Sequence, residues 1–379
     1  MKINQVVFKS KDEFLNKIHD IDFAGFDVHF LFADKLYLAD LDIQQVIDLK
    51  FKNEVLMGCS TAGEISLKNF EESSLNITSV KFKNARVKKC AITLDETKDS
   101  FKAGEHLAQQ LLEEDLKQVF VLSEGIHVNG TYLVDGLNSV LKNDINVSGG
   151  LAGDNAEFLK TYVADMNNQF VSDCISAIGI YGSDIHSGSG SYGGWDSFGI
   201  DRIVTKSKDN VVYEIDGKPA LELYKFYLGD MSKDLPGSAL FFPLEMRESE
   251  DSELLVRTIL GINESENSLT FAGNIPEGAF VRLMKTNVNR VIDAAEKAAN
   301  LIDELIIDDA KLVLMVSCVG RKLVLKQLTQ DEVEAVTSSF SDETVFAGFY
   351  SYGELSKLKG NHACNLHNQT MTLTAISES

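Results

Sequence analysis

The sequence predicts an α/β fold of two related halves. Mixed sheets are expected from repeated strand-helix-strand-Gly-turn units, with helices packed on the sheets. The first observation is a duplicated stretch: residues 55–66 read VLMGCSTAGEIS and residues 345–356 read VFAGFYSYGELS. In each copy an apolar run ends at a glycine, and a second glycine precedes a carboxylate, Glu64 or Glu354. This pattern is typical of a buried strand that leaves a sheet by a tight turn, because glycine permits positive φ.

The second observation is that the sequence around the two copies also repeats. Residues 26–32 and 311–318 are strand-like, and each is followed by a segment able to form a helix before the Gly-Glu motif. A looser third copy spans residues 119–155 and ends in VSGGLAGD at residues 147–154. Repeated units of this kind favour an α/β architecture with partly parallel sheets.

The remaining elements follow in chain order. An amphipathic helix is expected at residues 100–114, with Ser100 as its cap. Residues 182–199 form the segment richest in Gly and Ser and contain the single tryptophan. They predict either a flexible junction, near residues 182–200, or a loop that folds over another part of the protein. Beyond it we expect a hairpin turn at Asp216-Gly217, a helix starting at Pro219, and a meander that includes strands at 239–244 and 268–271. The last elements are a long helix at 288–307 and a closing strand at 368–376.

Composition limits the classes of partner. The formal net charge of -21 repels phosphate backbones and anionic lipid, so neither nucleic acid nor a membrane surface is an expected partner. The start of the chain lacks the pattern of a signal peptide, and no apolar run approaches the ~20 residues needed to span a bilayer. Five dispersed cysteines without C-x-x-C spacing predict reduced core thiols in a cytoplasmic protein.

Several motifs together resemble the FIST family of sensory proteins, which have a FIST N-terminal and a FIST C-terminal domain. The resemblance covers nearly the whole chain, in family order, and implies an N-type domain at residues 1–190 and a C-type domain at residues 191–379. The motifs are GCSTAGEI (58–65), SGGLAGD (148–154), GWDSFG (194–199), DGKPALELY (216–224), SCVGR (317–321), GFYSYGEL (348–355) and HNQTMTL (367–373).

What the resemblance implies is intracellular sensing of a small molecule, with amino acids proposed as ligands for the family. The signal would pass to a separate effector, such as a histidine kinase, a chemotaxis receptor or a cyclic-di-GMP enzyme. One branch of the family is described as haem-binding nitric oxide sensors, so haem is the alternative ligand. Its candidate axial ligands are His29, His106, His127, His186, His362 and His367, none of which matches a haem-ligand motif.

The predicted ligand-binding residues cluster where strands end, since ligands of open α/β sheets bind outside the carboxyl ends of strands. If a pseudo-twofold relation brings the two Gly-Glu turns together, Glu64 and Glu354 would suit an ammonium group, and Arg321 is a candidate clamp for a carboxylate. For each of these the alternative is structural: a carboxylate that caps a turn, or an arginine in a salt bridge. The other candidates are polar or aromatic residues beside these motifs: Ser60, Thr61, Asp154, Asn155, Tyr350, Ser351, Tyr352, His367 and Asn368.

An enzyme that acts on a small metabolite through Cys59 or Glu64 is the third functional hypothesis. Cys59 lies within GCSTAG, which is not the G-x-S-x-G nucleophile elbow, and no histidine can be assigned to it from spacing. The segment SGGLAG lacks the lysine of a phosphate-binding loop. The sequence therefore favours a sensor without catalytic residues, and no metal site is expected.

Overall fold

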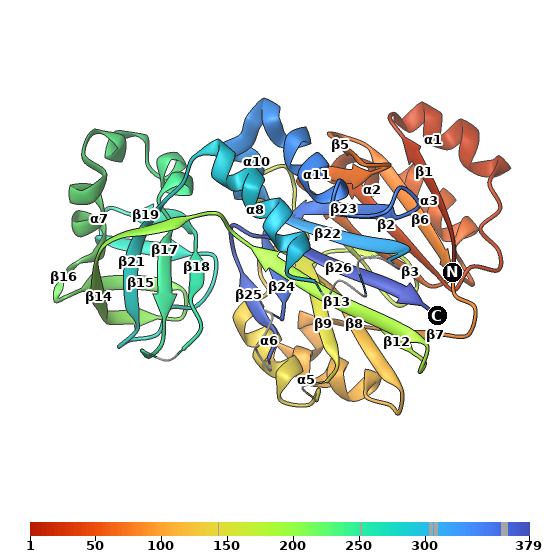
Figure 1. Ribbon diagram of the computed structural model, residues 1–379, viewed down its shortest axis with the longest axis horizontal. Coiled ribbons are helices and arrows are strands. Elements are labelled where there is room, and N and C mark those ends of the chain that lie inside the picture. Colours follow the sequence, from red (N-terminus) through yellow and green to blue (C-terminus); the bar gives the residue numbers. More distant parts are fainter. Residues whose placement is uncertain (143, 251, 303–305, 307–309, 358–362) are drawn as a thin grey trace.

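A computed structural model describes residues 1–142, 144–250, 252–302, 306, 310–357 and 363–379. The predicted α/β class is confirmed, since several mixed sheets carry helices on their faces (Figure 1). In this described part of the chain, no helix is both long enough and apolar enough to cross a membrane. All five cysteines are buried free thiols, as predicted.

The first copy of the repeat builds the first sheet. Its central strands β2 and β3 are parallel, and helices α2 (Lys35–Leu38) and α3 (Leu41–Lys50) connect them. The predicted strand-helix-strand unit is therefore present. The strand order is β1 (Lys2–Phe8), β6 (Leu75–Lys81), β2 (Val28–Asp34), β3 (Leu56–Thr61), β10 (Val163–Ala164) and β11 (Phe170–Val171).

The looser third copy builds the second sheet in the same way. Its parallel pair is β8 and β9, connected through α6 (Gly130–Asn138), and α5 (Ser100–Leu111) packs beside α6. Asp99 rather than Ser100 caps α5, because its side chain accepts the first free N–H groups. The strand order is β25 (Asn365–His367), β24 (Gly353–Ser356), β9 (Asn146–Leu151), β8 (Leu116–Ser123), β12 (Cys174–Tyr181) and β7 (Arg86–Thr93).

The second of the two clear copies builds the third sheet, with β22 and β23 as its parallel pair. Helices α10 (Val319–Leu325) and α11 (Thr329–Thr337) connect this pair, and α8 (Val288–Asn300) packs on the same sheet. Residues 303–305 and 307 of the helix predicted at 288–307 lie outside the described residues. The strand order is β13 (Ile185–Tyr192), β26 (Met371–Glu378), β22 (Leu312–Cys318), β23 (Val345–Ser351), β4 (Glu64–Ser66) and β5 (Asn69–Glu71).

The three units exchange hairpins in a closed ring. The hairpin β4–β5, which follows β3, pairs with β23 of the third sheet, and β24–β25, which follows β23, pairs with β9 of the second sheet. The hairpin β10–β11, which comes after β9, pairs with β3 of the first sheet. Each Gly-turn therefore carries the chain from its own sheet to a neighbouring one.

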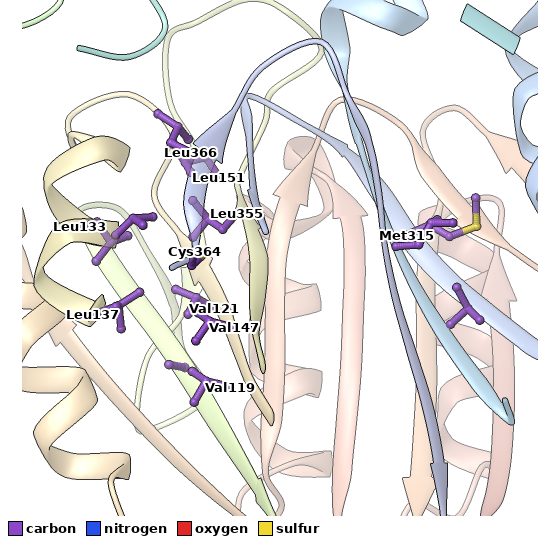
Figure 2. Packing of buried hydrophobic residues seen from close by; sticks show 14 of the residues in the cluster. Val119, Val121, Leu133, Leu137, Val147, Leu151, Met315, Leu355, Cys364 and Leu366 are labelled. Atoms are coloured by element: carbon purple, nitrogen blue, oxygen red, sulfur yellow. The ribbon is translucent and has the colours of Figure 1, made fainter. Parts of the chain in front are cut away.

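Apolar side chains from different units fill the interior of this ring. The ring of Phe32 in β2 packs on that of Phe349 in β23, with centroids 4.8 Å apart, and Phe30 meets Phe120 of β8 at 5.8 Å. Figure 2 shows Leu355 and Leu366 of the exchanged β24–β25 hairpin beside Leu151 and Leu133 of the second unit. Burying apolar surface across the units makes the exchange part of the core.

A β-rich module lies between β13 and α8 in the sequence and at one end of the molecule in Figure 1. It has a core of its own around helix α7 (Ala220–Leu228), which starts just after Pro219 as predicted. The strand predicted at residues 239–244 is mostly absent, since residues 237–241 form a 3-10 helix and the next strand begins only at Leu244. The strands are β14 (Asp196–Lys208), β15 (Val211–Ile215), β16 (Lys218–Pro219), β17 (Leu244–Arg247), β18 (Leu255–Arg257), β19 (Ile259–Asn263), β20 (Ser268–Phe271) and β21 (Phe280–Lys285).

The prediction of a flexible junction at residues 182–199 was wrong. Residues 185–192 of this Gly/Ser-rich segment form strand β13, which pairs with β26 over eight residues, and its last four residues, 196–199, begin strand β14. Glycine is required at residue 190 because helix α8 lies against the strand, where a Cβ would collide with the carbonyl oxygen of Ala298. Small residues here serve close helix-strand packing and not chain flexibility.

Candidate functional site

Three buried acids occupy equivalent turns of the three units. In the parallel pairs, Thr61 lies opposite Asp34, Leu151 opposite Ser123 and Ser351 opposite Cys318. An acid follows three residues after Thr61, Leu151 and Ser351 in the chain. These acids are Glu64, Asp154 and Glu354. All three acids are fully buried. Three of the predicted site residues therefore occupy equivalent positions in the three units, where a pseudo-twofold relation between Glu64 and Glu354 was expected.

Glu64 and Glu354 tie the turns to a neighbouring strand. The Glu64 carboxylate accepts hydrogen bonds from the Thr61 hydroxyl and from the backbone N–H and hydroxyl of Ser74, the latter two at 2.9 Å. The Glu354 carboxylate accepts from the Ser351 hydroxyl at 2.7 Å and from the N–H and hydroxyl of Thr370 at 3.2 and 2.9 Å. Both acids thus have the structural role that the sequence left as the alternative.

Burial determines the protonation of these two acids. It raises the pKa of Glu64 to about 7 and the pKa of Glu354 to about 8, because a charged carboxylate loses its hydration. The hydrogen bonds from the neighbouring hydroxyl and N–H groups act in the opposite direction but are outweighed. Near neutral pH the two carboxyls are therefore close to their titration points.

Asp154, the acid of the second unit, organises a loop. Its carboxylate accepts the N–H groups of Phe158, Leu159 and Lys160 at 2.8 to 3.0 Å, together with the Tyr352 hydroxyl. Burial alone would raise the pKa of Asp154, but these hydrogen bonds outweigh it and lower the pKa. The loop at residues 154–160 is thereby held in place by a charged carboxylate whose two oxygens both accept hydrogen bonds.

Arg321 and Tyr350 belong to a closed network around Glu332. The Arg321 guanidinium is buried, bonds Glu332 at 2.6 Å and also donates to the carbonyl oxygens of Tyr192, Gly193, Val291 and Gln369. The Tyr350 hydroxyl donates to the same Glu332 at 2.6 Å. Arg321 therefore has the salt bridge that the sequence offered as the alternative to a ligand clamp.

The cleft between the module and the α/β units contains two neighbouring cavities. The first has a volume of about 130 Å3 and is mostly apolar; Cys318, Val319 and Leu323 line it from the third unit and Ile259 from the module. The second, of about 230 Å3, is more polar and lies between residues 125–130 and the module. Phe158 and Tyr352 line both cavities, so their stacked rings, 4.3 Å apart, stand between them.

Two residues that line the apolar cavity each have a buried oxygen without a partner among the described residues. Asn368 Oδ1 and Thr258 Oγ1 are buried and have no hydrogen-bond partner among the described residues. Asn368 uses its amide nitrogen to bond the carbonyl oxygen of His367 at 3.0 Å, which leaves the oxygen as an acceptor. A buried polar group without a partner costs about 1–3 kcal/mol, so a hydrogen-bond donor that reached either oxygen would remove that cost.

The structure thus separates the predicted site residues into three groups. Tyr352 and Asn368 line the cleft, whereas His367 lines a third cavity, of about 320 Å3, beside Trp195. The remaining predicted residues line neither cavity of the cleft, in the part of the chain that the structure describes. Ser60 bonds the Gly153 carbonyl oxygen and exposed Asn155 bonds Asp34, while Thr61, Glu64, Ser351 and Glu354 serve the turns.

Sequence reasoning missed the contribution of the module to the cleft. Thr258 lies between two short strands and belongs to no motif. The polar cavity includes His127, three residues after the buried Glu124. The Glu-x-x-His spacing of these two residues could have been noticed in the sequence. It follows a strand, however, and there the spacing alone does not show that two side chains lie close together.

The candidate haem ligands are scattered. His29 is buried beside Phe23 and Phe51 and bonds the Ser79 hydroxyl at 2.8 Å, while His106 and His186 are exposed. His367 bonds the Ser356 carbonyl oxygen at 3.1 Å through Nε2, and burial lowers its pKa to about 4. His362 lies outside the described residues. Cys59, the candidate nucleophile, is fully buried, and burial raises its pKa well above the usual range.

The cleft lies at the carboxyl ends of parallel strands and is covered by the module. This arrangement is typical of the α/β proteins that bind ligands at a strand crossover. The FIST N domain matches residues 27–218 and the FIST C domain matches residues 220–357, so the chain belongs to the FIST family. FIST domains are associated with sensory signalling proteins that bind small ligands.

Two individual proteins are similar at a lower level. An uncharacterized protein of Methanocaldococcus jannaschii, MJ1623, is 26% identical over 226 residues, which are 55% of this chain and 41% of that protein. The chain therefore covers less than half the length of this relative. A crystal structure of cyanuric acid hydrolase from A. caulinodans aligns with 100% of this chain and 98% of its own, at 9% identity and a TM-score of 0.37. Similarity at that level supports no conclusion about activity.

Proposed function

We propose that this protein is a sensor that binds a small molecule in the cleft between the module and the α/β units. The observation that carries the proposal is that Asn368 and Thr258 both line the apolar cavity and that each has a buried oxygen, Oδ1 or Oγ1, without a hydrogen-bond partner among the described residues. They belong to the two sides of the cleft, so a ligand that bonds both would link the module to the third unit.

The residues that line the two cavities indicate which chemical groups a ligand would need. An apolar group fits the cavity of Ile259, Val319 and Leu323, while polar groups fit the cavity of His127 and Asn129. A small amphipathic molecule satisfies both, and an amino acid with an apolar side chain is the example that we favour. The unpartnered oxygens accept hydrogen bonds, so the ligand must present N–H or O–H groups to them.

The signalling mechanism that we infer is a population shift between two placements of the module. The module is attached to the second unit by polar contacts, including Arg257 to the Leu366 carbonyl oxygen at 3.0 Å and Asn129 to Asn274 at 2.9 Å. A ligand that bonds both sides favours the closed placement by its difference in affinity for the two placements. A separate effector, such as a histidine kinase, a chemotaxis receptor or a cyclic-di-GMP enzyme, would read that placement.

The test is thermal unfolding against a panel of amino acids, amines, small carboxylates and haemin, with Thr258→Val as the diagnostic variant. A ligand at 100 times its dissociation constant adds about 2.7 kcal/mol to the free energy of unfolding. Thr258→Val removes an acceptor that has no partner in the protein, so it should preserve or raise the stability of the free protein. It should also weaken the binding of an active ligand about tenfold, the effect of one hydrogen bond.

The matched control is Thr344→Val. Thr344 is also buried, but its hydroxyl donates to the Ala310 carbonyl oxygen at 2.9 Å, away from the cleft. This variant should lose about 1 kcal/mol of stability and bind the ligand normally. Equal ligand affinity in wild type and Thr258→Val would reject the cleft as the site. Chemical conversion of the ligand by wild-type protein would reject the sensor in favour of an enzyme.

A further inference from the structure

Three side chains with metal-binding atoms meet at the end of the second sheet. Glu124 and His127 follow β8, and Asp173 precedes β12, which is the antiparallel neighbour of β8. His127 Nδ1 lies 3.0 Å from Asp173 Oδ1 and 3.5 Å from Glu124 Oε1. One donor atom from each residue can be chosen so that all three lie within 4.8 Å of one another.

The backbone holds this cluster in place. Glu124 N–H donates to the Cys174 carbonyl oxygen and Leu94 N–H donates to that of Asp173, both at 2.9 Å, so the sheet fixes the two strand ends. Gly125, between Glu124 and His127, lies directly against the Ala152 carbonyl oxygen, where a Cβ would not fit. The loop that carries His127 is therefore pressed against the body of the protein.

The Glu124 carboxylate is also oriented in advance. One oxygen, Oε2, accepts the N–H groups of His127 and Val128 at 2.6 and 3.2 Å, and the other, Oε1, accepts the Thr161 hydroxyl at 3.0 Å. Oε1 is the oxygen that points towards His127 Nδ1. Hydrogen bonds of this kind hold carboxylate ligands in position in metalloproteins and leave the second lone pair of Oε1 available.

We propose that Glu124, His127 and Asp173 bind a divalent transition metal ion, with Zn2+ as the best match. One imidazole nitrogen and two carboxylate oxygens are donors that Zn2+ accepts, with bonds of roughly 2.0–2.2 Å. In a tetrahedral site with such bonds, the ligand atoms lie roughly 3.4 Å apart. The distances from His127 Nδ1 to Asp173 Oδ1 and to Glu124 Oε1 are close to this value. The two carboxylates neutralise the charge of the ion, and binding replaces the direct contact of Nδ1 with Asp173 by bonds to the metal.

The site leaves at least one coordination position for a further ligand. Glu124 is buried, but the side chains of His127 and Asp173 are 62% and 46% exposed. His127 also lines the polar cavity of the cleft. Three protein ligands with an open fourth position are typical of zinc sites that bind or activate a second molecule. The proposal can be tested without the ligand that we propose for the cleft, since Thr258 and Asn368 line the apolar cavity and are not among the three metal ligands.

The experiment is a calorimetric titration of chelator-treated full-length protein with Zn2+, followed by Co2+ as a spectroscopic probe. We expect one ion per chain, and visible Co2+ bands of a four-coordinate site that Zn2+ abolishes. Asp173→Asn and His127→Ala each remove an exposed ligand and should weaken Zn2+ binding by at least about 100-fold, more than the loss of an outer-shell partner costs.

His106→Ala is the matched control, because His106 is an exposed histidine on α5. It should bind Zn2+ like wild type. The proposal is overturned if no ion binds, or if His127→Ala or Asp173→Asn binds as tightly as wild type. The proposal is also overturned if His106→Ala loses Zn2+ affinity to the same extent as His127→Ala and Asp173→Asn. Failure of the Thr258→Val test would leave these results unchanged, so the two proposals can fail separately.

Discussion

The Tyr352 hydroxyl donates a hydrogen bond to the carboxylate of Asp154, although 198 positions separate the two residues. The same tyrosine stacks on Phe158, whose N–H also bonds Asp154 at 2.8 Å. One buried carboxylate therefore fixes both rings of the wall between the two cavities of the cleft. Because Asp154 and Tyr352 come from different units, the exchange of hairpins also builds this wall.

The first prediction concerns that hydroxyl. Tyr352→Phe removes one of the donors to a buried carboxylate, and a hydrogen bond to a charged group contributes about 1.5–3 kcal/mol. We expect a loss of that size in the free energy of unfolding, measured by urea denaturation, and weaker binding of any ligand that occupies the cleft. Tyr162→Phe is the control, since no hydrogen bond of the Tyr162 hydroxyl is present in the described structure. Equal losses in both variants would contradict the prediction.

The second prediction follows from the raised pKa of Glu354. The folded protein holds a proton on this carboxyl up to about pH 8, whereas the unfolded chain releases it near 4.5. The contribution to stability is therefore complete below about pH 4.5 and is lost as the pH rises through about 8. Between these values the loss approaches at most about 1.4 kcal/mol per pH unit.

Glu354→Gln removes this titration, since glutamine mimics the neutral carboxyl. Relative to wild type, the variant should become steadily more stable as the pH rises from 5 to 8, as measured by melting temperature. Glu343→Gln is the comparison, because Lys311 lowers the pKa of exposed Glu343 and its titration lies below this range. A constant difference between wild type and Glu354→Gln across the range would contradict the assignment.

These acids also show what the sequence could and could not predict. The repeat around Glu64 and Glu354 revealed the α/β units and the turns, because apolar runs and glycines are local signals. The exchange of hairpins was not predictable, because it pairs residues such as Ile65 and Gly348, far apart in the chain. The cleft combines Asn368, which the motifs identified, with Thr258, which no motif marks, so only the tertiary structure brings the pair together.

The third prediction concerns the buried ion pair of Arg321 and Glu332. Arg321→Met leaves Glu332 buried without its charge partner, which typically costs about 3–5 kcal/mol. We expect a matching fall in the urea midpoint, or no folded protein at all. Lys311→Met breaks the exposed pair of Lys311 and Glu343, at 2.9 Å, and should cost less than about 1 kcal/mol. If Arg321 bound a ligand instead, Arg321→Met would retain its stability and lose only ligand affinity.

The fourth prediction tests why β13 is rich in glycine. Gly190→Ala places a methyl group against the carbonyl oxygen of Ala298, so either helix α8 or the strand must shift. Overpacking of this kind costs about 1–3 kcal/mol, and we expect a lower melting temperature together with faster hydrogen exchange in β13 and β26. Gly261→Ala in the module is the matched control, because a Cβ there would lie 4.0 Å from its nearest neighbour, the Cβ of Thr270. Similar stability of the two variants would mean that residues 185–192 tolerate added volume, as a flexible junction would and a strand packed beneath a helix would not.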